Sequence, residues 1–282
     1  MDIFEHIAPL QEKIQDYRNR DISIGFVPTM GALHAGHLSL VTCSKKQNDI
    51  TVVSIFVNPD QFNDKDDFMN YPKTLENDLK MLRQVNCDIV FVPGEKEIYP
   101  VPDNRTFDFD GLDVIMEGKY RPGHFNGVAK IVVRLFDIVK PHRAYFGYKD
   151  FQQLVIIRNV INQLRIPVEI VPCPIIREEN GLAMSSRNLR LDEAERTLAS
   201  NISSVLFYVR DNHHQFASVG ALRKYVFHQL SDIHHIKVEY FDIVDEKNLQ
   251  PVTSLRSPAG KVGCIAAWIG RVRLIDNVNI NS

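Results

Sequence analysis

The stretch "ISIGFVPTMGALHAGHLSLVTCSKK", residues 22–46, reads as a strand, a turn and a helix in succession. Residues 22–27 are an apolar run that predicts a buried strand, and residues 36–46 predict a helix. The turn between them carries two glycines and two histidines. A strand that leads through such a turn into a helix is the opening unit of an open α/β sheet, where helix N-termini bind phosphates.

The alternation of strand and helix continues through the first 174 residues. Apolar runs predict strands buried on both faces at residues 22–27, 50–57, 87–92, 143–147 and 168–172. Helices are predicted at residues 36–46, 74–84, 127–139 and 150–164. We therefore expect an α/β fold, a Rossmann-like doubly wound parallel sheet, in a domain spanning residues 1–174.

Two segments interrupt this alternation. Residues 58–73 are polar, rich in Asp and Asn, and hold two prolines, which predicts a long loop of the kind that covers active sites. Residues 95–125 are irregular and end in "EGKYRPGHF". At the N-terminus, apolar residues from Ile3 to Tyr17 recur at helical spacing and predict a helix.

After residue 175 the pattern changes to helices followed by strands. The spacing of Asp192 and Glu195 predicts a capping box at the start of one helix, and residues 219–230 predict another helix. Three strand-like runs follow: "IKVEYFDIV", "VGCIAAWIG" and "VRLID". This order predicts a smaller α+β domain over residues 175–282.

Composition excludes several classes of protein. A formal net charge of -2 argues against a general nucleic-acid binder. No apolar run approaches the length that spans a bilayer, so no membrane partner is expected. The four cysteines are widely spaced in apolar surroundings and are expected to be reduced core residues, which suits a cytoplasmic protein.

The two histidines of the opening stretch are the first candidates for chemistry. His34 and His37 are three residues apart at the expected helix N-terminus, so they can face the same way. Beside a bound phosphate, two imidazoles could donate hydrogen bonds to a pentavalent phosphorus and its leaving group. Zinc binding and core packing are the alternatives, although neither an HExxH motif nor an obvious third ligand is present.

Two further clusters support a phosphate site. The segment "FGYKDFQQL", residues 146–154, places Lys149 at the start of a helix. In a doubly wound sheet the strands at 22–27 and 143–147 are neighbours at the switch point, where ligands bind. The third cluster, "GLAMSSRN", joins the two domains and could close over a triphosphate, although alone it would be interpreted as a polar linker.

Together these clusters resemble the pantoate–β-alanine ligase family, or pantothenate synthetases, of the HxGH nucleotidyltransferase superfamily. "PTMGALHAGH" resembles the HxGH signature. Similar family segments follow in order over nearly the whole chain: "FVNPDQF", "YPKTLENDL", "MEGKYRPGHFNGVA", "FGYKDFQQL" and "REENGLAMSSRN". The resemblance implies ATP-dependent condensation of (R)-pantoate with β-alanine, through pantoyl adenylate, to give pantothenate, AMP and pyrophosphate.

The resemblance also implies residue roles. His37, His34 and Lys149 would be catalytic, with His37 as proton donor. The implied ATP-binding residues are Met30, Gly31, Ala32, Leu33, His34, Ala35, Gly36, His37, Gly147, Tyr148, Lys149, Asp150, Ile176, Met184, Ser185, Ser186 and Arg187. Gln61, Gln153 and Asn58 would bind the other substrates, and Asp78 would help hold Mg²⁺. A homodimer is implied as well.

Two positions depart from the family pattern. Tyr148 stands where glutamate is common, and Lys73 stands where arginine is common, which keeps the charge but loses the fork geometry. Neither departure removes a catalytic group. Because the acyl adenylate is hydrolysable, the loop at residues 58–73 and the C-terminal domain are the candidates for excluding water.

Two other functions are compatible with the motifs. One is a nucleotidyltransferase that releases a nucleotidyl product, such as a cytidylyltransferase, which analysis of products would distinguish. The other is a nucleotide-binding sensor without catalysis, which would need no histidine pair to stabilise a transition state.

Overall fold

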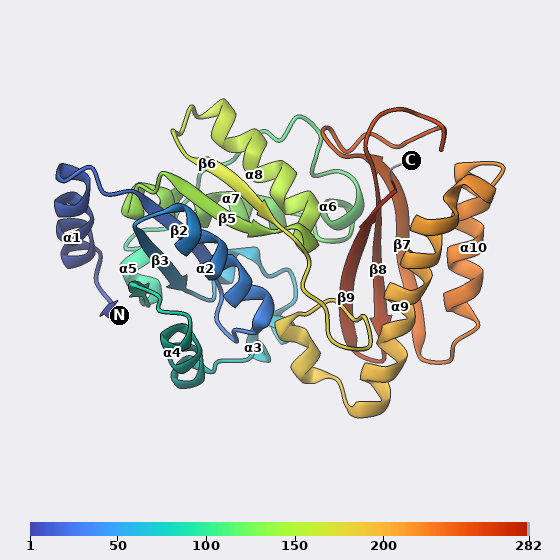
Figure 1. Ribbon diagram of the computed structural model, residues 1–282, viewed down its shortest axis with the longest axis horizontal. Coiled ribbons are helices and arrows are strands. Elements are labelled where there is room, and N and C mark those ends of the chain that lie inside the picture. The colour runs from blue at the N-terminus through green and yellow to red at the C-terminus, as the bar shows by residue number, and fades with distance from the viewer. Residues whose placement is uncertain (281–282) are drawn as a thin grey trace.

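The computed structural model describes residues 1–280, which form two sheets with helices packed around them (Figure 1). The larger sheet is parallel and has six strands in the order β1-β4-β3-β2-β5-β6. Its strands are β1 (Asp2–Phe4), β2 (Ile24–Thr29), β3 (Ile50–Ile55), β4 (Ile89–Phe91), β5 (Arg143–Gly147) and β6 (Glu169–Cys173). The predicted α/β class is confirmed.

The sheet is doubly wound around β2. The chain proceeds outward from β2 to β3 and β4, then returns to place β5 and β6 on the other side of β2. Gly25 and Phe26 of β2 lie opposite Arg143 and Ala144 of β5, so the predicted pairing of these two strands is confirmed. The winding reverses at this pair, which creates the switch point of the fold.

Helices cover both faces of this sheet, which explains the uninterrupted apolar runs. One face packs against α1 (Ile7–Asn19), α7 (His124–Val139) and α8 (Phe151–Gln163), and the other against α2 (Ala35–Gln47) and α4 (Leu75–Gln84). Phe26 contacts Phe136 of α7 with ring centroids 6.2 Å apart. The next residue, Val27, packs in the opposite core with Leu40 of α2. Neighbouring strand residues thus enter different cores.

The N-terminal prediction is wrong for its first residues. Residues 2–4 are not helical but form β1, whose Ile3 pairs with Val90 of β4, and the helix begins only at Ile7. The apolar stripe therefore belongs to two elements. A short segment of apolar residues fits either helical spacing or an edge strand, and pairing with β4 decides in favour of the strand.

The interrupting segments contain only short helices. Residues 58–73 hold η1 (Pro59–Gln61) and α3 (Lys65–Met69), and residues 95–125 hold α5 (Glu95–Ile98) and α6 (Met116–Tyr120). Three further short 3₁₀ helices are η2 (Tyr148–Asp150), η3 (Ser186–Arg190) and η4 (His213–Gln215). Residues 95–125 are therefore mostly irregular, as predicted, whereas half of residues 58–73 is helical, so this segment is more ordered than the predicted loop.

The C-terminal part is an antiparallel sheet covered by two long helices. It comprises α9 (Glu193–Asn212), α10 (Val219–Ser231), β7 (Ile236–Asp245), β8 (Lys261–Ile269) and β9 (Val272–Asn279), with strand order β7-β8-β9. The Asp192–Glu195 capping box is confirmed, with hydrogen bonds of 2.8 and 3.2 Å. The opposite face of this sheet packs against α8, because Tyr240 and Cys264 share a core with Val155.

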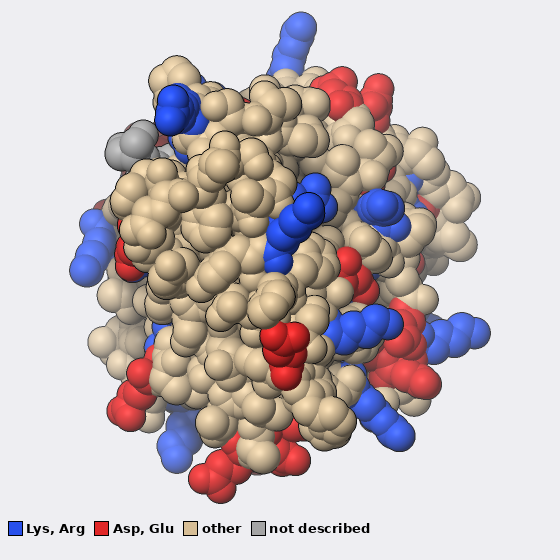
Figure 2. All heavy atoms as spheres, turned by 90° about the vertical axis from the view of Figure 1, so that its right-hand side faces the viewer, with Lys and Arg blue, Asp and Glu red and all other residues tan. Residues whose placement is uncertain are grey.

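The surface and the cysteines fit the composition. On the side of the C-terminal part, basic and acidic side chains are interspersed over a largely uncharged surface (Figure 2). All four cysteines are free, and burial raises the pKa of the Cys87 thiol to about 12. Across residues 1–280, no helix combines the length and apolar character needed to cross a membrane.

A close approach of backbone in α7 gives the first prediction. A Cβ on Gly127 would lie 2.1 Å from the carbonyl oxygen of Asp60, so Gly127→Ala forces η1 away from α7. We expect a loss of about 1–3 kcal/mol in the free energy of unfolding, measured by urea denaturation. The matched Gly220→Ala variant, whose new Cβ meets only a serine hydroxyl at 3.8 Å, should be no less stable than the parent. Unchanged stability of Gly127→Ala would contradict this packing.

Candidate active site

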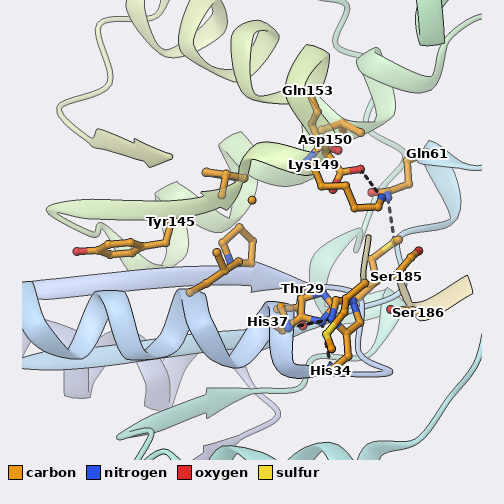
Figure 3. Close-up of a pocket in the computed structure, with 18 of the residues that line it drawn as sticks. Thr29, His34, His37, Gln61, Tyr145, Lys149, Asp150, Gln153, Ser185 and Ser186 are labelled. Atoms are coloured by element: carbon orange, nitrogen blue, oxygen red, sulfur yellow. Dashed lines mark hydrogen bonds and ion pairs between the residues drawn. The ribbon is translucent and has the colours of Figure 1, made fainter. Parts of the chain in front are cut away.

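A cavity of about 210 Å³ lies at the switch point, beside the carboxyl ends of β2, β5 and β6 (Figure 3). Segments far apart in the sequence contribute to it. The sequence-predicted residues that line it are Met30, His34, Gly36, His37, Asn58, Gln61, Gly147, Lys149, Asp150, Gln153, Ile176, Met184, Ser185, Ser186 and Arg187. Its apolar wall comes largely from α7, through Val128, Ile131, Val132 and Leu135.

The histidine pair forms the start of α2. His34 is the N-cap, and its Nδ1 accepts the amide of Gly36 at 3.1 Å. The Nδ1 of His37 accepts the amide of His34 at 3.4 Å, so the two side chains cap the helix reciprocally. The ring centroids are 4.1 Å apart. Because both Nδ1 atoms accept, the proton of each neutral ring resides on Nε2, which is left as a donor.

Both imidazoles are neutral at pH 7. Burial, assisted by the charge of Lys149, lowers the pKa of His34 to about 4. The pKa of His37 is also well below its usual value, first because of burial and then because of His34 and Lys149. The pair therefore offers hydrogen-bond donors without bringing two more positive charges to the site.

Lys149 faces the histidines across the cavity, as Figure 3 shows. It lies in η2, directly after β5, and its amine is 3.6 Å from the carboxylate of Asp150. The side chain of Lys149 is only 16% exposed. The structure thus brings His34, His37 and Lys149 together around one cavity, although they are over a hundred residues apart in the sequence.

A second cation at the cavity, Arg187, is engaged by the loop at residues 58–73. Its Nη2 lies 2.7 Å from the Asp67 carboxylate, which also accepts from Arg190 at 2.8 Å. These ion pairs hold the pKa of Asp67 below its usual value despite burial. A neighbouring cavity of about 680 Å³ shares Lys149 and Arg187 in its lining. Cationic groups therefore extend outward from the histidines.

The amide side chains differ in how they are held. Asn58 is buried and its carboxamide is engaged, donating to the carbonyl of Gly127 at 3.1 Å and accepting from Tyr99 at 3.0 Å. Gln61 is positioned beside Met30, with Nε2 2.9 Å from the sulfur. Gln153 points into the cavity (Figure 3), whereas the adjacent Gln152 is buried outside it.

Six predicted site residues do not line this cavity: Gly31, Ala32, Leu33, Ala35, Tyr148 and Asp78. The hydroxyl of Tyr148 instead donates to Asn279, and its ring packs against Phe151. Asp78 is 1% exposed and accepts the amides of Ala32 and Leu33, both at 2.9 Å. This geometry argues against the predicted Mg²⁺ ligand, because both oxygens are already used inside the protein.

Sequence reasoning missed several residues around the cavity. Nothing in the sequence distinguishes Asp67 from the other acidic residues of its loop. Tyr71 lines the cavity, but its motif, "YPKTLENDL", indicates the family and not a role for the tyrosine. His124 and Arg121 both bond to the carbonyl oxygen of Gln61, at 2.7 and 3.2 Å. Their motif, "KYRPGHF", gave no indication that they support Gln61 rather than contact a ligand.

A helix N-terminus with a neutral histidine pair, at the switch point of a doubly wound sheet, is typical of the class of α/β proteins that bind a phosphate group there. Sequence comparison narrows this class. The sequence model of the family described as pantoate-beta-alanine ligase matches residues 2–279. The chain belongs to this family.

Individual relatives agree over the full length. A protein of Bacteroides fragilis named pantothenate synthetase is 49% identical over 281 residues, covering 99% of this chain and 98% of that protein. The crystal structure of pantothenate synthetase from Thermus thermophilus matches with a TM-score of 0.93 at 38% identity and covers 100% of both chains. The pantoate-beta-alanine ligase of Francisella tularensis, complexed with beta-gamma ATP and beta-alanine, matches at 34% identity and a TM-score of 0.78, covering 99% of this chain and 97% of that one.

The support of Gln61 by His124 predicts a dependence of stability on pH. Burial first, and then Arg121, lower the pKa of His124 to about 3. The unfolded chain binds the proton near pH 6.5 while the folded chain does not, so stability falls as the pH drops from 6.5 toward 3. Between pH 6 and 5, the free energy of unfolding of the wild type, measured with urea, should fall with decreasing pH more steeply than that of His124→Gln. The difference in slope should be up to about 1.4 kcal/mol per pH unit. The exposed His214→Gln is the control for removing a histidine. Equal slopes for wild type and His124→Gln would contradict this origin.

Proposed function

We propose that the cavity at the β2–β5 switch point is the active site in which the ligase reaction of this family takes place. The enzyme condenses (R)-pantoate with β-alanine at the expense of ATP, a step of pantothenate biosynthesis. The convergence of the neutral histidine pair with Lys149 on one cavity is the observation that carries the proposal. The adjoining glutamines, Gln61 and Gln153, supply polar groups for the second and third substrates.

The first step forms the acyl adenylate. A carboxylate oxygen of pantoate attacks the α-phosphorus of ATP, the bond to the bridging oxygen breaks, and pyrophosphate leaves. The Nε2–H groups of His34 and His37 would donate to the phosphate oxygens as negative charge builds up. Lys149 and Arg187 would stabilise the charge on the triphosphate, and the helix dipole of α2 acts in the same direction.

The second step transfers the acyl group. The amine of β-alanine attacks the acyl carbon, the carbon–oxygen bond to AMP breaks, and the amine loses a proton. Pantoate must therefore be held with its carboxyl group toward the histidines. Gln61 and Gln153 can bind its hydroxyl groups, while the wall of Val128, Ile131 and Val132 suits its two methyl groups. Asn58 would act by holding η1 rather than by touching the substrate.

Mg²⁺ is proposed to enter with ATP. Bound to phosphate oxygens, it would neutralise part of their charge. In the described part of the chain, no group of three His, Cys, Asp or Glu residues could hold a metal, and Asp150 is the one carboxylate that lines the cavity. A phosphate-bound Mg²⁺ that keeps its waters and takes at most one carboxylate fits this lining, with Asp150 as that ligand.

We assign residues 1–174 to nucleotide and pantoate binding and residues 175–282 to a domain that completes the site through Met184 to Arg187. Because the C-terminal sheet shares a core with α8, we infer that the loop at residues 58–73 makes the larger movement when the site closes. The homodimer and the cytoplasmic location remain predictions from the family resemblance.

Product formation by a histidine variant tests the proposed function. The wild type should release pyrophosphate from ATP only when pantoate is present, and AMP should follow only after β-alanine is added. His37→Ala should bind ATP yet lose about 10²–10³-fold of pyrophosphate release, because one donor to the transition state is gone. Release of a nucleotidyl product, or full turnover by His37→Ala, would refute the proposal; exposed His214→Ala is the control.

The Asp67–Arg187 ion pair predicts a gain in nucleotide affinity. ATP must displace Asp67 before Arg187 can bind phosphate, so Asp67→Asn should lower the Kd for ATP by roughly two- to fivefold, as fits a partly exposed ion pair. Isothermal titration calorimetry can measure this change. Asp66→Asn, an exposed neighbour in α3, is the matched control and should leave the Kd unchanged. Weaker binding by Asp67→Asn would show that Asp67 does not compete with ATP.

A further inference from the structure

The turn before the histidines has an unusual backbone. Gly31 and Ala32 both have positive φ, at 79° and 48°. For a residue with a side chain, such as Ala32, this conformation carries a strain of about 1 kcal/mol or more and persists only where the surroundings hold it. His34, the N-cap of α2, follows two residues later. The direction in which the chain enters α2 therefore depends on this turn.

A buried carboxylate holds the turn. Successive amides of a turn with left-handed residues form a concave site for an anion, and here that anion is Asp78 of α4. Its Oδ2 accepts from Ala32 and its Oδ1 from Leu33, both at 2.9 Å. The hydroxyl of Thr74 donates to Oδ1 at 3.0 Å. Within residues 1–280, Asp78 makes no ion pair with Lys or Arg, so these three hydrogen-bond donors are the partners of its carboxylate.

The same peptide segment is held from its other side. The carbonyl of Ala32 accepts from the hydroxyl of Ser186, at 3.0 Å. Ala32 therefore connects α4, the histidine turn and the 184–187 segment through its two backbone polar groups. A Cβ on Gly31 would lie 3.0 Å from Oδ2 of Asp78, so the carboxylate also packs directly beneath the turn.

We propose that Asp78 is the positioning residue of the histidine pair and is not a metal ligand. This inference rests on the proposed role of His34 and His37 in adenylate formation. By fixing Gly31–Leu33 in its left-handed turn, Asp78 sets where α2 begins and hence where the two Nε2–H groups lie. Its oxygens face the turn, and Asp78 does not line the cavity that would receive the triphosphate.

Asp78→Asn tests the proposal, because the amide keeps the shape but replaces one acceptor oxygen with a donor that faces an amide N–H. In the free, metal-free protein, hydrogen exchange at Ala32 and Leu33 should become faster. The kcat for pyrophosphate release should fall about tenfold or more, because a small displacement of reacting groups is enough. The Kd for ATP and the Mg²⁺ concentration for half-maximal rate should change less than about threefold.

Two further variants keep the test decisive. Glu76→Gln, an exposed acid-to-amide change on the same helix, should match the wild type in every measurement. Thr74→Val removes one of the three donors and leaves the carboxylate. It should also give faster exchange at Ala32 and Leu33 and a lower kcat, but to a smaller degree. Should Asp78→Asn not fold, Thr74→Val takes its place in the test. A large increase in the Mg²⁺ requirement with unchanged exchange would overturn the proposal in favour of a metal ligand.

Unchanged exchange and unchanged kcat would overturn it as well. Should the wild type fail to release pyrophosphate from ATP and pantoate, the proposed function fails. The exchange rates at Ala32 and Leu33 would then still decide whether Asp78 holds the turn, so the two failures are distinguishable.

Discussion

The reversal of winding between β2 and β5 fixes where the cavity forms and which segments can reach it. It leaves the carboxyl ends of two central strands without a crossing connection between them, so a cavity forms there. The turn after β2 leads into α2 and carries the histidines, and the turn after β5 carries Lys149. Both turns therefore face the cavity, which α7 and residues 184–187 enclose from the other sides.

The electrostatic design of the site follows from this enclosure. Burial beside Lys149 keeps both histidines neutral, so they act as donors and add no repulsion between cations. Lys149 and Arg187 are paired with Asp150 and Asp67. The loop at residues 58–73 thus supplies Asp67 as the anion that neutralises Arg187 in this structure.

Much of the fold could be predicted because strands buried on both faces leave long apolar runs, as in residues 143–147, where predicted and observed bounds agree. The errors occur where local sequence is ambiguous. Residues 2–4 fit the pattern of a helix as well as that of a strand. They become a strand because they pair with β4, which is distant in the sequence. The 3₁₀ turn at residues 59–61 left no pattern, because its position depends on close contact with α7.

For the site, the residue pattern alone indicates the class of chemistry. The spacing of His34 and His37, the position of Lys149 after a strand and the order of the family motifs can all be found in the linear sequence. Which partners the polar atoms of each residue bind could be established only from the folded chain. The motif around Asp78 indicates a metal ligand, yet the oxygens of this residue hold a turn that is distant in the sequence. A motif records which residue types occur, whereas hydrogen bonding depends on distances between segments that the sequence does not contain.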